Sequence, residues 1–140
     1  MGDPEVLRGP GRLRLLLDTH VLIWALEDSP ALPATARAEV TNAANEVFVS
    51  AASVWEIEIK RALGRLKAPQ DVPGGCDAAG FVRLSISFDH GIGAGRLPLH
   101  HGDPFDRMLI AQARAEALTF ATADHELARY DVPILDVSGG

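Results

Sequence analysis

The sequence predicts an α/β fold, a three-layer α/β/α sandwich with a mostly parallel central sheet of four to five strands. Strand patterns alternate with helix patterns along most of the chain, which is typical of a parallel sheet covered by helices on both faces. The composition is that of a globular domain, because 47% of the residues are hydrophobic and 23% are charged. A length of 140 residues favours one domain.

The first elements are predicted from short apolar runs and helical spacing. Residues 13–17, LRLLL, form an apolar run that predicts a buried strand ending at Asp18. Apolar residues at helical spacing predict a helix over 19–27, and an Ala-rich stretch predicts a second helix over 34–44. The β-branched and aromatic run EVFVS predicts a strand over 46–50.

The middle of the chain is predicted to contain a long helix over 51–66. Its apolar residues recur at helical intervals, so we expect Trp55, like Trp24, to lie in the core. The next stretches are predicted to be a loop with a short helix near Ala78, a strand, and a Gly- and His-rich loop, over 68–80, 82–88 and 89–102.

The C-terminal third begins with a well-signalled helix over 104–117. Asp103 is a favourable N-cap, and proline is favoured at the first helical position. Pro133 cannot donate to a strand ladder, so the last strand is expected at an edge of the sheet. The remaining predicted elements are a strand, a short helix and that edge strand, over 118–122, 124–130 and 132–135.

Composition also bounds the setting in which the chain works. Residues 1–12 are rich in Gly, Pro and charge and are predicted to be a flexible leader, with the domain over 13–137. Cys76 is the sole cysteine, which excludes an internal disulfide and suits a reducing cytoplasm. No apolar run approaches the roughly 18 residues of a membrane span, so no membrane contact is expected. The net charge of −6 argues against a passive binder of polyanions.

Several acids are predicted to meet at one edge of the sheet. Asp18 ends the first strand and Asp124 follows the fourth, and ligands of open α/β sheets bind beyond these strand ends. Asp106 lies in the first turn of its helix. Inside the helix over 51–66, periodicity does not choose between Glu56 and Glu58. Carboxylates gathered without cysteine or paired histidines suit a hard cation such as Mg²⁺ or Mn²⁺.

Each of these residues also has an ordinary structural interpretation. Asp18, Asp103 and Asp124 could cap helices, and for Asp103 the cap is favoured. Glu56 could pair with Lys60, one helical turn further on.

Positive charge and histidine are equally open to two interpretations. A basic strip could bind RNA phosphates, although Lys and Arg are also common at helix C-termini. A ligand role for the adjacent His100 and His101 is not favoured, because their spacing does not suit one helix face. The candidate RNA-binding residues are Lys60, Arg61, Arg65, Lys67 and Arg107.

Four blocks of the sequence together resemble a known family. LLLDTHVLIWALED at 15–28, SAASVWEIEIKRALGRL at 50–66, HGDPFDRMLIAQA at 101–113 and FATADHELARYDVPIL at 120–135 look like the successive signatures of PIN-domain ribonucleases. The nearest likeness is to the VapC toxins of type II toxin–antitoxin modules.

The resemblance implies a metal-dependent endoribonuclease that uses Mg²⁺ or Mn²⁺. Such an enzyme hydrolyses RNA phosphodiester bonds with a water activated at a carboxylate-bound metal ion. By motif, the four metal-binding and catalytic acids are Asp18, Glu56, Asp106 and Asp124, which favours Glu56 over Glu58. Polar residues that commonly support these acids match Thr19, Ser53 and Thr122.

The resemblance also implies partners. A cognate VapB-type antitoxin is expected to inhibit the toxin, and the family commonly forms homodimers. The alternative is a non-catalytic PIN-like module that binds RNA or protein, in which the acids are caps and surface pairs. All four acidic positions are filled, which disfavours that alternative.

Overall fold

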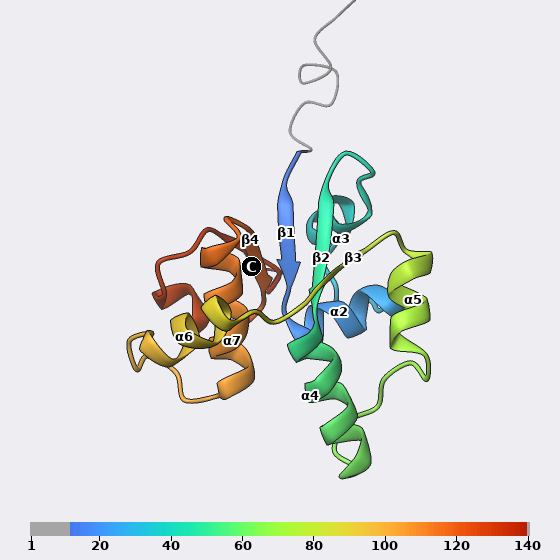
Figure 1. The fold of residues 1–140 in the computed structure, drawn as a ribbon. Coiled ribbons are helices and arrows are strands. Elements are labelled where there is room, and N and C mark those ends of the chain that lie inside the picture. The colour runs from blue at the N-terminus through green and yellow to red at the C-terminus, as the bar shows by residue number, and fades with distance from the viewer. Residues whose placement is uncertain (1–11, 140) are drawn as a thin grey trace, which may run out of the picture.

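The computed structural model describes residues 12–139, which fold around a five-stranded parallel sheet in the order β3-β2-β1-β4-β5 (Figure 1). The predicted α/β fold is therefore confirmed. Residues 1–11 of the expected leader lie outside the described residues. The strands are β1 Arg14–Leu17, β2 Glu46–Ser50, β3 Val82–Leu84, β4 Thr119–Thr122 and β5 Ile134–Asp136.

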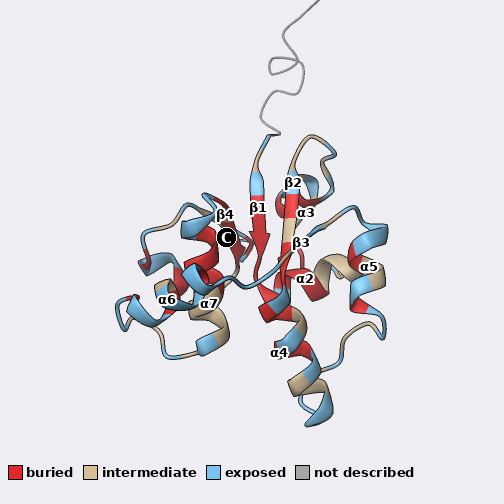
Figure 2. Cartoon of the chain, in the orientation of Figure 1, coloured by how far each residue is buried: buried red, intermediate tan, exposed pale blue. Residues whose placement is uncertain are grey.

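Helices cover both faces of the sheet (Figures 1 and 2). They are α2 Thr19–Leu26, α3 Ala34–Thr41, α4 Ala51–Ala62, α5 Val72–Ala78, α6 Phe88–Arg96 and α7 Pro104–Ala115, with a 3₁₀ turn, η1, at Leu127–Arg129. Within residues 12–139, none of these helices is long and apolar enough to cross a membrane.

The central strand β1 supplies both hydrophobic cores. Side chains alternate across a strand, so Leu15 and Leu17 face one side of the sheet and Leu16 faces the other. The first core contains residues of α2, α3 and α5, and the second contains residues of α6 and α7. All three leucines are fully buried, which holds the C-terminal end of β1 rigidly between the two helical layers.

The stretch expected to be a loop over 89–102 is in fact partly helical, and this prediction was wrong. Ser87 caps α6, since its hydroxyl accepts from the main-chain N–H of His90, while His90 Nδ1 accepts from the N–H of Ser87. Glycines weaken a helix on their own. Here packing compensates, because Ala94 of α6 is buried in the second core together with Leu109 and Ile110 of α7. Consequently, the third strand ends at Leu84 rather than at 88.

The buried face of α4 also differs from the predicted one. Trp55 is 60% exposed rather than in the core, whereas Trp24 is half-buried against the first core. The buried residues of α4 are Ala52, Ser53, Glu56 and Ile57. A face made partly of polar residues explains why apolar periodicity could not choose between Glu56 and Glu58.

Candidate functional site

A cavity of about 290 Å³ opens at the C-terminal ends of β1 and β4, where the sequence analysis placed the acids. All four predicted acids line it, so the structure brings together residues from four separate segments. Asp103 and Lys60 also line it. The remaining lining residues are Thr19, His20, Trp24 and Ala123.

Asp18 is held by both of its carboxylate oxygens. The main-chain N–H of Thr19 donates to Oδ1 at 2.7 Å, which makes Asp18 the N-cap of α2. The hydroxyl of Thr122 donates to Oδ2 at 2.6 Å across the β1–β4 boundary. Burial raises the pKa of Asp18, and the hydrogen bond from Thr122 opposes that rise. The Asp18 side chain therefore caps α2 and also lines the cavity.

Glu56 lies on the buried face of α4 and is 4% exposed. The hydroxyl of Thr19 donates to Glu56 Oε1 at 2.7 Å, and it also lies 3.0 Å from the hydroxyl of Ser53. Lys60 Nζ donates to Glu56 Oε2 at 2.5 Å from the cavity wall. Glu58, by contrast, is exposed and pairs with Arg61.

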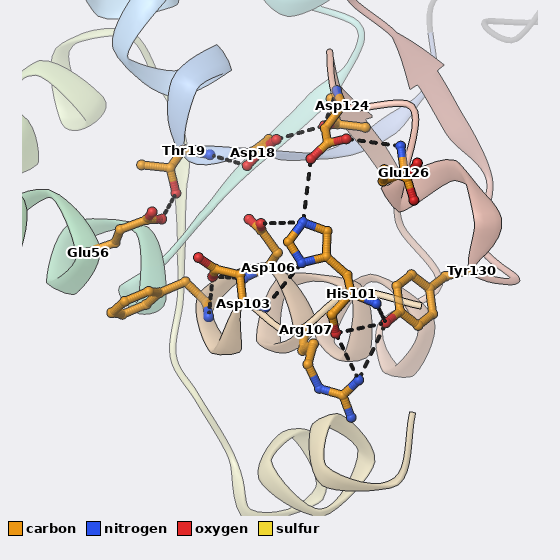
Figure 3. Close-up of polar contacts among 12 residues, drawn as sticks. Asp18, Thr19, Glu56, His101, Asp103, Asp106, Arg107, Asp124, Glu126 and Tyr130 are labelled. Atoms are coloured by element: carbon orange, nitrogen blue, oxygen red, sulfur yellow. Dashed lines mark hydrogen bonds and ion pairs between the residues drawn. The ribbon is translucent and has the colours of Figure 1, made fainter. Parts of the chain in front are cut away.

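Asp124 follows β4 and is positioned by its own main chain. Its N–H donates to the hydroxyl of Thr122 at 3.0 Å, so Thr122 contacts both Asp18 and Asp124. Asp124 Oδ1 accepts from the main-chain N–H of Glu126 at 2.9 Å, a contact that resembles a helix cap (Figure 3). Asp124 also lines the cavity, and its Oδ2 lies 3.6 Å from His101 Nε2.

The carboxyl group of Asp106 is half-buried among four other carboxylates. Burial, and to a smaller extent the neighbouring carboxylates of Asp18, Asp103, Glu56 and Asp124, together raise its pKa to about 8. Asp103 is the N-cap of α7, as predicted, and accepts from the N–H groups of Phe105 and Asp106. Its carboxylate nevertheless faces the same cavity.

His101, for which a ligand role was not favoured from sequence, lies beside two of the acids. Its Nε2 lies 3.5 Å from Asp106 Oδ2 and 3.6 Å from Asp124 Oδ2 (Figure 3). Within the described part of the chain, these three residues form the group whose candidate ligand atoms all lie within 4.8 Å of one another. His101 precedes Asp103 by two residues, but no linear spacing signals that Asp124 would lie opposite it. The adjacent His100 instead packs edge-on against Tyr130.

The candidate RNA-binding residues are not equivalent in the structure. Arg61 donates to the carbonyl oxygens of Ala68 and Pro69, and Lys60 pairs with Glu56. Arg65 and Lys67 are exposed just beyond the end of α4.

Arg107 stabilises the segment between α6 and α7 through hydrogen bonds to main-chain oxygens. Its guanidinium donates to the carbonyl oxygens of Ala94, Leu97, Pro98 and His101 at 2.9 to 3.3 Å. Five N–H donors in a planar fork suit such multiple contacts. Most of its donors are therefore engaged within the protein.

The donor set fits a hard divalent cation. Oxygen ligands from carboxylates are those preferred by Mg²⁺ and Mn²⁺. Burial raises the pKa of Asp106 and the neighbouring carboxylates add to the rise, and a divalent cation would oppose both effects. Asp106 and Asp124 offer candidate ligand atoms within 4.8 Å of each other, and Asp18 and Glu56 line the same cavity.

A model of the PIN domain matches residues 15–133, nearly the whole described chain. The chain belongs to the PIN domain family. The four acids of this PIN domain all fall within the matched residues. No curated protein matches the sequence significantly.

Solved structures of toxin–antitoxin complexes share the fold of this PIN domain. One is a VapBC2 complex from Rickettsia felis bound to promoter DNA. The matched chain in it is 15% identical, with a TM-score of 0.66, and the alignment covers 89% of this chain and 98% of the matched chain. DNA-bound VapBC from Salmonella typhimurium is 16% identical, with a TM-score of 0.64 and the same two coverages. VapBC-5 from Mycobacterium tuberculosis is 20% identical, with a TM-score of 0.55, again covering 89% and 98%.

Proposed function

We propose that this PIN domain is a metal-dependent endoribonuclease and the toxin of a type II toxin–antitoxin system. The observation that carries the proposal is the cavity in which Asp18, Glu56, Asp106 and Asp124 converge. Side chains separated by up to 106 positions in the sequence meet there, and burial together with the neighbouring carboxylates raises the pKa of Asp106. Structural caps would not require four carboxylates to share one hollow.

The residues of the cavity divide the work of binding and positioning. Asp106 and Asp124 would bind Mg²⁺ or Mn²⁺, and Asp18 and Glu56 would complete the site directly or through water. The chemistry that a bound divalent ion supplies is activation of water and neutralisation of phosphodiester charge. Thr122 orients Asp18, and Thr19 orients Glu56, because each hydroxyl donates to one oxygen of its carboxylate.

RNA is the proposed substrate, and charge explains how an acidic chain could approach it. A bound divalent ion would reverse the local sign of the cavity. Lys60 lines the cavity, and Arg65 and Lys67 are exposed just after the end of the same helix, α4. These three cations form the basic strip proposed to contact RNA phosphates.

The test is metal-stimulated cleavage of a varied set of RNAs by purified protein. We expect Asp18→Asn to abolish cleavage while leaving the fold intact, because an amide oxygen can still accept from the Thr19 N–H as an N-cap. Glu56→Gln should also lose cleavage. Glu58→Gln is its matched control, since Glu58 lies on the same helix but is exposed.

Two results would count against the proposal. Undiminished cleavage by pure Asp18→Asn protein would exclude the assigned site. Absence of metal-stimulated cleavage by the wild type on every RNA tried would instead favour a non-catalytic PIN-like binding module.

A VapB-type antitoxin is the proposed inhibitor and partner. The structures with this fold include VapBC complexes. The described chain also exposes large hydrophobic side chains that a partner could cover, among them Trp55, Leu63, Phe88 and Leu99. A homodimer would cover part of the same surface.

Co-expression with the neighbouring reading frame tests this partnership. We expect a stable complex whose RNA cleavage is suppressed, and size-exclusion chromatography with light scattering gives the number of copies. Consistent recovery of an active, partner-free chain from the native operon would contradict the proposed inhibition.

A further inference from the structure

The imidazole of His101 faces the acids of the cavity, and its hydrogen bonds fix its tautomer. The main-chain N–H of Asp103 donates to His101 Nδ1 at 3.1 Å. A neutral imidazole carries one hydrogen, and an Nδ1 that accepts a hydrogen bond does not hold it. The hydrogen of His101 therefore lies on Nε2.

That Nε2–H is directed between two carboxylates. The Nε2 atom lies 3.5 Å from Asp106 Oδ2 and 3.6 Å from Asp124 Oδ2 (Figure 3). These separations are long for direct hydrogen bonds, but short enough for an N–H dipole to attract both oxygens. Direct coordination of a metal ion by His101 is the competing role, since the three side chains form one compact group. An Nε2 that carries hydrogen has no lone pair to offer a metal ion.

The main chain of His101 is held as firmly as its ring. Its N–H donates to the hydroxyl of Tyr130 at 3.0 Å, and its carbonyl oxygen accepts from Arg107 at 3.3 Å. Tyr130 is 3% exposed and donates in turn to the carbonyl oxygen of Pro98. Contacts on both sides of the residue therefore fix where the imidazole points.

We propose that His101 is a positioning residue whose Nε2–H keeps Asp106 and Asp124 side by side for the metal ion without itself binding that ion. The inference rests on the proposed function, because it takes these carboxylates to be metal ligands. A neutral donor reduces the repulsion between the two acids. Unlike Lys60 beside Glu56, it adds no positive charge that would repel a cation.

Two substitutions separate this role from simple support of the loop. An Asn at position 101 could still accept from the Asp103 N–H two residues later, as in an Asx turn. Its shorter side chain would not carry an N–H to Asp106 and Asp124. His101→Asn thus keeps the hydrogen bond within the loop and removes the donor to the acids, whereas His101→Ala removes both.

Mn²⁺ binding to the full chain, followed by the EPR signal of free Mn²⁺, measures the positioning role. We expect both His101→Asn and His101→Ala to bind Mn²⁺ about tenfold more weakly than the wild type, as for other residues that orient metal ligands. Wild-type affinity in His101→Asn would overturn the inference, because only the hydrogen bond within the loop would then matter.

Spectroscopy distinguishes positioning from coordination. Pulsed EPR of the Mn²⁺-loaded protein should show no nitrogen coupling from a directly bound imidazole. A coupling that disappears in His101→Asn would overturn the inference. In metal-free protein labelled with ¹⁵N-histidine, the His101 resonance is identified in the NMR spectrum by its absence from His101→Asn. It should show the Nε2–H tautomer, and the Nδ1–H tautomer would contradict the inference.

The outcomes also separate this inference from the function on which it rests. A wild-type chain that binds no Mn²⁺ would contradict the proposed function, and the role of His101 with it. Mn²⁺ binding that is equally tight in the wild type and both variants would contradict the role of His101 alone.

Discussion

At the scale of single residues, Asp106 dominates the electrostatics of the site. Its side chain is only 18% exposed and faces carboxylates from three other segments. The pKa of about 8 means that Asp106 holds a proton at neutral pH when no cation is bound. Metal binding must displace that proton, so the affinity for Mg²⁺ or Mn²⁺ should rise as the pH increases toward 8.

This raised pKa predicts how stability depends on pH. Between the ordinary pKa of 3.8 and about 8, the folded chain holds the Asp106 proton and the unfolded chain has lost it. Folding therefore binds a proton, and the free energy of unfolding contributed by Asp106 falls as the pH rises through this window. Chemical denaturation of metal-free protein from pH 5 to 8.5 measures the slope.

Asp106→Asn should flatten that slope, because the amide does not titrate. Asp131→Asn is the control, since Asp131 is an exposed acid and does not line the cavity. A slope that is the same in the wild type and in Asp106→Asn would show that Asp106 does not hold the proton.

At the scale of elements, the loop before α7 depends on Arg107. Four carbonyl oxygens between Ala94 and His101 accept from its guanidinium. Arg107→Lys retains the charge but not the planar fork. We expect faster amide hydrogen exchange over residues 97–103 and a decrease of about 2 kcal/mol in the free energy of unfolding.

The same variant discriminates between the two interpretations of Arg107. A phosphate-binding cation would tolerate lysine, and the loop would then exchange as in the wild type. Arg96→Lys is a suitable control, because Arg96 is an exposed neighbour at the end of α6. Unchanged exchange in Arg107→Lys would contradict the structural role.

Element order was predictable from sequence, but two features were not. Strand patterns and caps located β1, β2, β4 and the start of α7, because these signals are local. Helix α6 was missed because its glycines disfavour a helix locally, and packing on α7 compensates. The buried face of α4 was misjudged because it includes the polar residues Ser53 and Glu56, whose side chains contact the hydroxyl of Thr19.

The residues of the candidate site were likewise predictable from sequence only in part. Asp18 and Asp124 were placed from strand ends, a rule of the fold class. The choice of Glu56 needed family resemblance, since periodicity was neutral between Glu56 and Glu58. His101 could not be found by either route, because its proximity to Asp124 depends on how two loops meet in space.

At the scale of the whole molecule, a net charge of −6 would oppose association with RNA, the proposed substrate. Binding would then depend on the exposed cations near the cavity. We expect the double variant Arg65→Gln/Lys67→Gln to weaken RNA binding. The dependence of log affinity on log salt should become shallower by about 0.7 for each phosphate that the variant no longer neutralises. Fluorescence anisotropy with a labelled single-stranded RNA measures this, in an Asp18→Asn background that prevents cleavage.

Arg83→Gln is the control for the loss of positive charge at a site away from the cavity. Arg83 is an exposed arginine on the edge strand β3 and pairs with Asp77, away from the residues that line the cavity. The double variant removes two positive charges and Arg83→Gln removes one. A change in salt dependence that is the same per charge removed would show that net charge alone, rather than the position of Arg65 and Lys67, controls binding.

The hydrogen bond from Thr122 to Asp18 joins residues 104 positions apart. A ribosome must therefore synthesise the chain at least through Thr122, and the segment carrying β4 must leave the exit tunnel, before that bond can form. Nascent fragments that end before Asp124 lack one wall of the cavity. An endonuclease arranged in this way would remain harmless to the messenger that encodes it until its β4 segment has emerged from the ribosome.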